Sequence, residues 1–251
     1  MPFDPFAFLA AALGVFLIAF TKGAFGGGFA IIGLPILSLG MEPLQAGVLL
    51  APLFLVMDVF AFRYWRPGTW SVPDALRLIP ASLVGIAVGY LLMRSVDSRW
   101  AQVIMALITL VFLLQWLIGG GTAEARPRST VKGVVCGFAG GVTSMIAHSG
   151  GPPVAMYLLP LGLAKTVYAG TTSLFFTVGN VVKIGPWIAL AAPTAETWAL
   201  MAAMVPICPL GVIAGWKLHQ RLDQQQMVRW CYGLLSVTTL KLLWDGLKGF
   251  L

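Results

Sequence analysis

Long apolar runs alternate with short polar connectors along the whole chain. An apolar run of about 20 residues is long enough for a helix to cross about 30 Å of hydrocarbon, so these runs predict membrane helices. Ten helical pieces are predicted, covering residues 6–22, 28–40, 44–64, 75–94, 99–118, 129–146, 152–163, 167–190, 196–218 and 226–247. The pattern therefore predicts an all-α polytopic membrane protein.

Two of the long runs are interrupted in the middle. Residues 6–40 contain Gly26-Gly27-Gly28, and residues 129–163 contain Ser149-Gly150-Gly151-Pro152-Pro153. Glycine is a poor helix former and proline removes a backbone donor, so each run predicts a hairpin of two broken helices. Such a hairpin is either re-entrant or a pair of bent spans, and we favour the re-entrant form. Non-helical backbone at membrane depth has to be buried in protein or line a cavity.

Three blocks of the first half recur in the second half in the same order. Residues 14–28 correspond to 137–151 at an offset of 123, and residues 54–59 correspond to 176–181 at an offset of 122. Pro80, Gly85, Gly89 and Asp97 correspond to Pro206, Gly211, Gly215 and Asp223 at an offset of 126. This order predicts two repeats, 1–120 and 121–251, joined by the polar connector Gly119–Thr130. Each repeat is a broken hairpin followed by three transmembrane helices, and both together form one membrane domain.

Composition and charge fix the class and the orientation. The 251 residues are 59% hydrophobic and 10% charged, which excludes a soluble enzyme or a nucleic-acid binder. The net charge of +7 is a by-product of topology, because cytoplasmic loops carry surplus Lys and Arg. Ten basic residues fall on one side: Arg63, Arg66, Arg77, Arg126, Arg128, Lys132, Lys165, Lys217, Arg221 and Arg229. Four fall on the other: Arg94, Arg99, Lys241 and Lys248. The bias predicts a cell inner-membrane protein with both termini periplasmic and its two repeats inverted.

Four ionisable residues lie inside apolar runs: Lys22, Asp58, His148 and Lys183. Such residues are functional candidates, because a charge in the membrane is costly. Lys22, His148 and Lys183 can attract or hydrogen-bond an anion, and Asn180 lies one helical turn before Lys183. Asp58, which matches Asn180 in the repeat, either carries a coupling proton or forms a salt bridge with a basic partner. A structural hydrogen bond is the alternative for His148.

The two glycine breaks are the second group of candidates. A helix that starts after a break points free N–H groups and a positive dipole end at the gap, and glycines let an oxyanion approach closely. We expect the helix starts at Phe29 and Val154 to meet near the membrane midplane. The predicted substrate-binding backbone comprises Gly26, Gly27, Gly28, Ser149, Gly150, Gly151 and Pro152. Gly85, Gly89, Gly211 and Gly215 instead predict close helix packing.

Other features predict little chemistry. Two histidines and three scattered cysteines do not form a metal site, and no phosphate-binding loop is present, so we expect no metal and no cofactor. The tryptophans near predicted helix ends, among them Trp65 and Trp187, are expected to be interfacial anchors. An intramembrane enzyme would need Ser149 and His148 as nucleophile and base, yet neighbouring residues on a helix point about 100° apart.

The broken segments GAFGGGFAIIGLPIL and GFAGGVTSMIAHSGGPPVAMYLLPLG resemble those of the sulfite exporter TauE/SafE family, and the resemblance covers nearly the whole chain. It implies a carrier for sulfite, sulfoacetate or another sulfonate. By that pattern, Gly26–Gly28 and Gly150–Pro153 form the pathway, with Asp58 and Asn180 on flanking helices. His148-Ser149 stands where the family pattern has a further glycine, and this difference leaves the particular anion open.

The main hypothesis is a secondary transporter for a small anion, coupled to an ion gradient and bound at the midplane between the two breaks. The alternative is a passive anion channel that uses the same helix ends. The expected partners are a small anion, the lipid bilayer and a coupling proton or sodium ion, with no nucleic acid. The pattern leaves open whether the chain forms a homo-oligomer.

Overall fold

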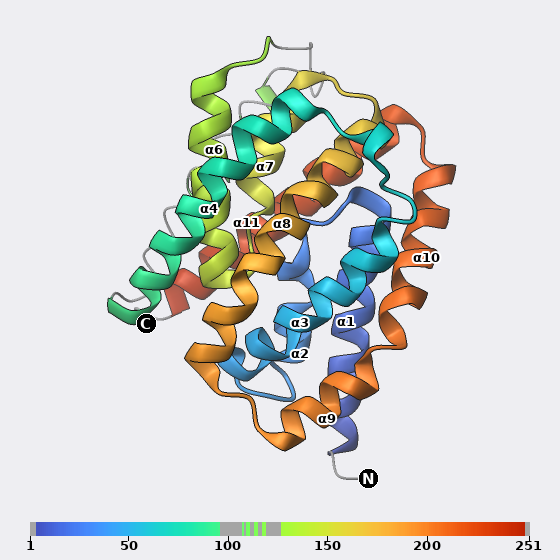
Figure 1. Ribbon diagram of the computed structural model, residues 1–251. Helices are drawn as coiled ribbons and strands as arrows, with labels where there is room; N and C mark the ends of the chain where they lie inside the picture. Colours follow the sequence, from blue (N-terminus) through green and yellow to red (C-terminus); the bar gives the residue numbers. More distant parts are fainter. Residues whose placement is uncertain are drawn as a thin grey trace.

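The computed structural model describes residues 4–95 and 127–248, with positions 107, 109, 110, 113, 114, 117 and 118 between them. Throughout this part of the chain the regular elements are helices (Figure 1). In order they are α1 (Pro5–Phe25), η1 (Ala30–Ile32), α2 (Leu34–Leu37), α3 (Pro43–Ala61), η2 (Pro67–Thr69), α4 (Val72–Ser95), α6 (Thr130–Ala147), α7 (Gly151–Leu158), η3 (Leu159–Leu161), α8 (Lys165–Ala191), α9 (Ala195–Met204), α10 (Ile207–Arg221) and α11 (Gln224–Lys248). The all-α prediction is confirmed. The predicted helix at 99–118 lies mostly outside the described residues.

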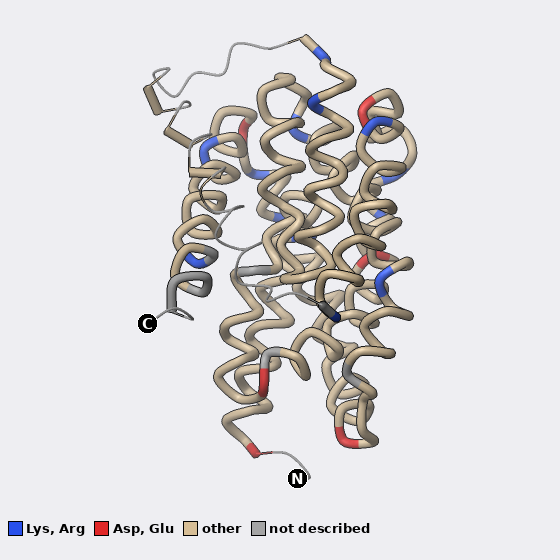
Figure 2. Tube along the Cα trace, turned by 90° about the vertical axis from the view of Figure 1, so that its left-hand side faces the viewer, with Lys and Arg blue, Asp and Glu red and all other residues tan. Residues whose placement is uncertain are grey.

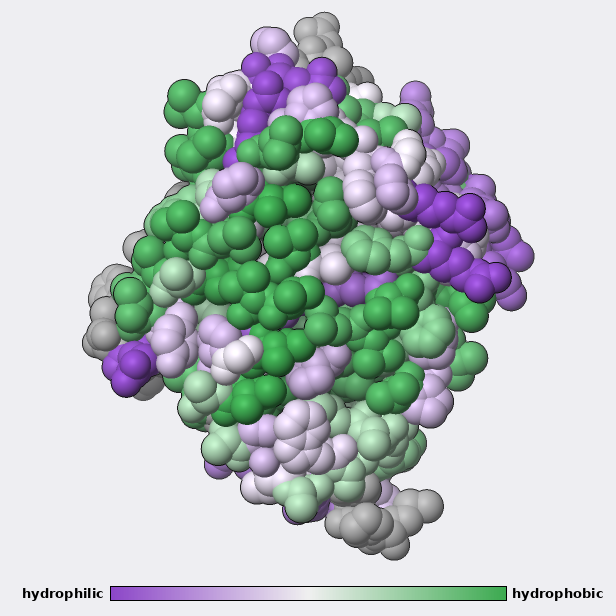
Figure 3. Space-filling view, in the orientation of Figure 1, coloured by the Kyte–Doolittle hydropathy of each residue, from purple (hydrophilic) through white to green (hydrophobic). Residues whose placement is uncertain are grey.

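Six described segments are long and apolar enough to cross a membrane. They are Pro5–Phe25, Leu44–Ala61, Val72–Arg94, Thr130–Ala147, Lys165–Leu190 and Ala195–Arg221. Large apolar side chains such as Leu9, Leu76 and Leu210 are exposed on these helices, and Figure 3 shows apolar side chains over the middle of the visible face. A surface of this kind requires lipid rather than water around it. The prediction of a polytopic membrane protein is confirmed.

Two predicted helices are wrong in detail because proline and glycine interrupt them. The piece at 28–40 is not one helix: it forms the short elements η1 and α2, with Gly33 between them. Pro35 has no N–H, so it cannot continue the hydrogen-bond ladder of a longer helix. The piece at 196–218 is divided into α9 and α10 by a turn at Val205 and Pro206 for the same reason.

The helices pack in reciprocal pairs between the two halves of the chain. α4 lies along α6, α1 lies along α10, and α3 crosses α8. The four packing glycines are at these contacts, as predicted: a Cβ on Gly85 would overlap the carbonyl of Phe138, and one on Gly215 would overlap the carbonyl of Phe20. Gly89 and Gly211 lie against the same partner helices. Small residues therefore bring these helix backbones together.

Corresponding helices of the two halves run in opposite directions. In Figure 1, α1 and α3 run away from the end that holds the N-terminus, whereas α6 and α8 run towards it. Opposite directions of this kind are what inverted repeats predict. Lys and Arg residues gather at the end opposite the N-terminus, and acidic residues lie at both ends (Figure 2). The division into repeats 1–120 and 121–251 stays a prediction.

Candidate functional site

The two helix breaks lie against each other. α1 ends at Phe25, and the following Gly26, Gly27 and Gly28 have φ values of 81°, 107° and 91°, which only glycine adopts readily. α6 ends at Ala147, the next residue, His148, has a φ of 49°, and α7 begins at Gly151. A Cβ atom on Gly151 would overlap the carbonyl of Gly28. Close contact between the breaks therefore depends on glycine at both positions.

A buried ion pair flanks the first break. The Lys22 ammonium nitrogen, near the end of α1, lies 2.5 Å from Asp58 Oδ1 on α3. On α8, the Thr177 hydroxyl donates to the same oxygen at 2.5 Å, and the Asn180 amide donates to Asp58 Oδ2 at 2.8 Å. The Asp58 carboxylate is thus fully engaged. The salt bridge that the sequence left open for Asp58 is present.

A second buried ammonium group, that of Lys183, lies near the same aromatic ring as the first. Lys183 Nζ on α8 donates to the Ser144 hydroxyl at 2.8 Å and lies 3.4 Å from the Ser144 carbonyl oxygen. Lys183 Nζ and Lys22 Nζ are 5.4 Å and 5.7 Å from the centre of the Phe54 ring. Among the described residues, no carboxylate lies within ion-pair distance of Lys183. The ring contributes a cation–π attraction to each lysine but cannot neutralise either charge.

The imidazole ring of His148 is positioned by one hydrogen bond and by contacts with two aromatic rings. Its Nε2 lies 3.2 Å from the Gly47 carbonyl oxygen on α3. The imidazole stacks on Trp187 with a centroid distance of 4.6 Å and an interplanar angle of 18°, and it lies 5.1 Å from Phe54. The structural hydrogen bond considered for His148 is therefore present, while its Nδ1 has no partner among the described residues.

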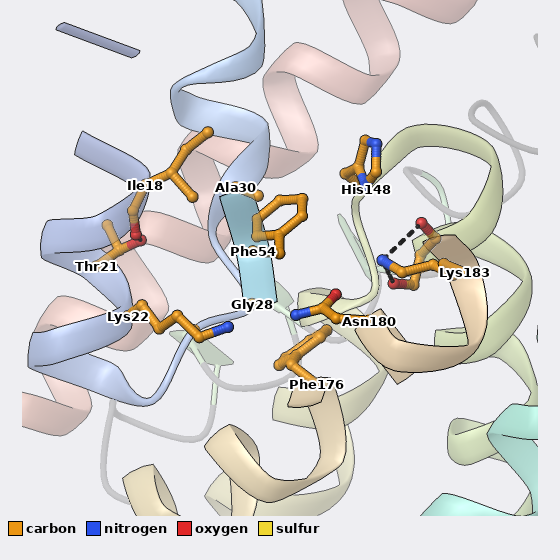
Figure 4. A pocket seen from close by; sticks show the side chains of 12 residues that line it. Ile18, Thr21, Lys22, Gly28, Ala30, Phe54, His148, Phe176, Asn180 and Lys183 are labelled. Atoms are coloured by element: carbon orange, nitrogen blue, oxygen red, sulfur yellow. Dashed lines mark hydrogen bonds between the residues drawn. The ribbon is translucent and has the colours of Figure 1, made fainter. Parts of the chain in front are cut away.

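These groups line one small cavity in the interior (Figure 4). Its lining residues are Ile18, Thr21, Lys22, Gly27, Gly28, Ala30, Phe54, Ser144, His148, Phe176, Asn180 and Lys183. Six predicted site residues are thus brought together: Lys22, Gly27, Gly28, His148, Asn180 and Lys183. The cavity combines ammonium, amide and imidazole groups with an aromatic wall, a combination that suits a small polar anion.

The remaining six predicted residues lie outside the cavity lining, and several of them pack against its walls. Gly26 packs on the backbone of Ala169, Gly150 on Gly140 and Ser144, and Gly151 on Gly28. Ser149 and Pro152 are buried, and Asp58 lies behind Lys22. None of these six is among the lining residues.

The helices that follow the two breaks are short, and their role in anion binding stays a prediction. After the first break the chain forms a three-residue η1 turn and a four-residue α2. The second break is followed by the eight-residue α7, in which Pro152 and Pro153 lack N–H groups. The cavity also contains two ammonium groups, of which Lys22 is paired with Asp58 and Lys183 has no carboxylate within ion-pair distance among the described residues.

Two aromatic residues near the site, Phe54 and Phe176, were missed from the sequence, and two others, Trp187 and Trp65, were misplaced. Phe54 and Phe176 line the cavity, and they occupy matching positions in the repeat, a signal that the sequence contained. Trp187 was expected at the membrane interface but is buried against His148. Trp65 is also buried, and its Nε1 donates to the Lys22 carbonyl at 3.2 Å. Both indoles therefore position site residues.

A separate buried network ties α7 to α4. Asp74, at the start of α4, accepts hydrogen bonds from Ser71 at 2.5 Å and from the Tyr157 hydroxyl at 2.9 Å. Arg128 and Arg77 lie 3.2 Å and 3.4 Å from the same carboxylate. Asp74 was not selected from the sequence, because this residue lies in the first turn of its helix and not inside an apolar run. The network holds the second broken hairpin in position.

An all-helical membrane protein whose broken helices surround a buried, cation-lined cavity has the architecture of a membrane transport protein. The chain belongs to the sulfite exporter TauE/SafE family, whose model matches residues 11–242, nearly the whole chain. No curated protein and no solved structure matches it. The family resemblance seen in the broken segments is confirmed. The family consists of transporters rather than enzymes and implies export of sulfite or a related anion across a membrane.

Proposed function

We propose that this protein is a secondary transporter of a small sulfur-containing or organic oxyanion, such as sulfite, sulfoacetate or another sulfonate. The anion binds in the cavity between the first glycine break and helices α6 and α8. Transport is coupled to an ion gradient of protons or sodium. The chain works in the inner membrane with both termini periplasmic.

The observation that carries the proposal is the surplus of buried positive charge. Lys22 and Asp58 compensate each other at 2.5 Å, so this pair has no net charge. Lys183 lies 3% exposed, with the Ser144 hydroxyl as its closest hydrogen-bond partner. Burying an ammonium group without a counter-charge is costly, and an incoming oxyanion supplies that counter-charge.

The lining residues suit an oxyanion of small size. Lys183 offers a charged donor, and Asn180 offers the second hydrogen of the amide that already donates to Asp58. Gly27 and Gly28 leave the backbone uncovered on one side. Phe54 and Phe176 form an apolar wall that fits the organic part of a sulfonate. The Asp58 carboxylate forms an ion pair with Lys22. Ion coupling through Asp58 stays a prediction.

The test is anion flux into proteoliposomes that contain the purified protein. With sulfite or sulfoacetate outside, an imposed proton or sodium gradient should drive accumulation above equilibrium, and protein-free liposomes with the same gradient are the control. Flux that only runs down the anion's own gradient and carries current would instead identify a passive channel. Absence of flux for all the sulfur oxyanions tested would refute the proposal.

A further inference from the structure

The hydrogen bond of His148 defines which ring nitrogen carries the proton. Nε2 lies 3.2 Å from the Gly47 carbonyl oxygen. A carbonyl oxygen only accepts hydrogen bonds, so Nε2 is the protonated nitrogen of the ring. In the neutral ring, Nδ1 then carries a lone pair. That nitrogen is buried and without a partner among the described residues, on a residue that lines the cavity.

The charges around this imidazole can be added up element by element. α8 contributes Lys183, α1 contributes Lys22, and α3 contributes Asp58, which is paired with Lys22. Among the described residues, the groups in contact with the ring are uncharged: the Gly47 carbonyl, Phe54 and Trp187. The Ser144 hydroxyl, which lines the same cavity, is uncharged as well. The site therefore has one surplus positive charge, which a singly charged anion balances completely.

A doubly charged oxyanion would leave one negative charge uncompensated in this cavity. A lone pair on Nδ1 would also repel any anion oxygen that approached it. Protonation of Nδ1 removes both problems, because the imidazolium adds the missing positive charge and turns the nitrogen into a donor. Imidazolium and Lys183 together then balance two negative charges.

We propose that His148 takes up a proton when a doubly charged oxyanion enters the cavity, so that dianion and proton bind together. This inference rests on the proposed transport function and assigns the site a substrate class, the dianionic oxyanions. The proton adds to the Nδ1 lone pair, either from solvent or from the singly protonated form of the anion. No bond within the anion changes except the O–H bond of that protonated form. A singly charged anion needs no such proton.

The first test compares two anions by titration calorimetry on the purified full-length protein at neutral pH. Sulfoacetate is doubly charged there, because its carboxyl group has an ordinary pKa of about 4, and methanesulfonate is singly charged. Measurements in buffers with different ionisation enthalpies give the protons taken up on binding. We expect about one proton for sulfoacetate and none for methanesulfonate.

The matched variant is His148→Gln, whose amide nitrogen can still donate to the Gly47 carbonyl but which cannot be protonated. Because His148 lines the cavity, both affinities can change, but the loss should be at least about tenfold larger for sulfoacetate than for methanesulfonate, and the variant should take up no proton. Equal proton uptake by the variant, or no uptake with sulfoacetate in the unchanged protein, would overturn the inference while leaving the transport proposal intact. If neither anion bound the unchanged protein, the inference would be overturned, whereas the transport proposal is decided separately by the flux of sulfite and the other oxyanions.

A second measurement needs no substitution at His148. The chain has two histidines, and the ring of His219 contacts a carbonyl through Nδ1, at 2.8 Å from Ala24. The two rings therefore have opposite tautomers, which nitrogen NMR on histidine-labelled protein distinguishes. Saturating sulfoacetate should protonate both nitrogens of His148 and leave His219 unchanged. A His148 ring that carries its proton on Nδ1 beforehand, or that does not respond to sulfoacetate, would overturn the inference.

Discussion

Two buried lysines, Lys22 and Lys183, lie near the Phe54 ring, and they differ in their hydrogen-bond and ion-pair partners. Lys22 has the Asp58 carboxylate at 2.5 Å, whereas Lys183 has the Ser144 hydroxyl at 2.8 Å. A charge with a fixed partner stabilises the fold, and a charge without one is available for a ligand. The two residues are therefore expected to respond differently to substitution.

Replacing Lys183 with glutamine should weaken anion binding without unfolding the protein. A hydrogen bond to a charged group contributes about 1.5–3 kcal/mol, so the Kd for sulfite or sulfoacetate should rise by at least about tenfold. Titration calorimetry measures this change. Lys217→Gln removes an exposed lysine of α10 and should leave the Kd unchanged. An unaltered Kd in Lys183→Gln would assign this lysine a purely structural role.

Breaking the Lys22–Asp58 pair should destabilise the protein strongly. Lys22→Met and Asp58→Asn each leave one buried charge without a partner, which costs about 3–5 kcal/mol. The double variant leaves no such charge, so its thermal unfolding temperature in detergent should lie above that of both single variants. A double variant whose loss equals the sum of the two single losses would contradict direct pairing.

At the scale of elements, the two helix breaks act as one structural unit. Gly28 and Gly151 come from different halves of the chain, and each leaves no room for a side chain on the other. Phe176 packs against both Gly28 and Gly150, so α8 holds the two breaks from one side. Any change in the spacing of α1 and α6 must therefore move the cavity wall.

Gly151→Ala should lower the unfolding temperature and abolish anion flux, because its Cβ would overlap the Gly28 carbonyl. The backbones at the two breaks would have to separate by an ångström or more. Gly233→Ala on α11 is the control, since no atom lies within 4 Å of the added Cβ, and a helix gains about 1 kcal/mol from alanine in place of glycine. Native-like stability and flux in Gly151→Ala would show that the contact between the breaks is dispensable.

At the scale of the molecule, charge divides the protein into two ends. Basic residues gather at the end opposite the N-terminus (Figure 2), and they include Arg128 beside the exposed Ser129 at the start of α6. Cytoplasmic loops carry the excess of Lys and Arg, so this end should face the cytoplasm. Orientation also decides on which side the cavity loads its anion.

Cysteine labelling in intact cells checks this orientation. Ser129→Cys should resist a membrane-impermeant maleimide added outside, whereas Glu196→Cys at the start of α9 should react. The native Cys136, Cys208 and Cys231 are buried, so they give little background. Labelling of Ser129→Cys from outside would reverse the proposed topology.

Much of the fold is predictable from local sequence. The lengths of the apolar runs determine where most helices form, because a membrane helix satisfies its backbone hydrogen bonds within itself. The glycine and proline clusters determine where α1 and α6 end, because several such residues in a row strongly disfavour a helix, whereas single ones such as Pro52 and Pro186 are tolerated inside α3 and α8. Lys22, Asp58, His148 and Lys183 can also be identified from the sequence, because ionisable residues are rare in apolar runs. These properties belong to each segment alone.

Partnership among those residues depends on tertiary structure. The packing of α1 against α3 places Lys22 beside Asp58. The packing of α6 against α8 places Lys183 beside the Ser144 hydroxyl. His148 found its carbonyl on α3, 101 residues away in the chain, and Trp187 turned inwards to stack on it. Rotating a helix about its axis gives each of its side chains different neighbours. That rotation is set by packing against all the other helices. The sequence therefore determined which charges enter the membrane, and the packing decided which one has no carboxylate partner among the described residues.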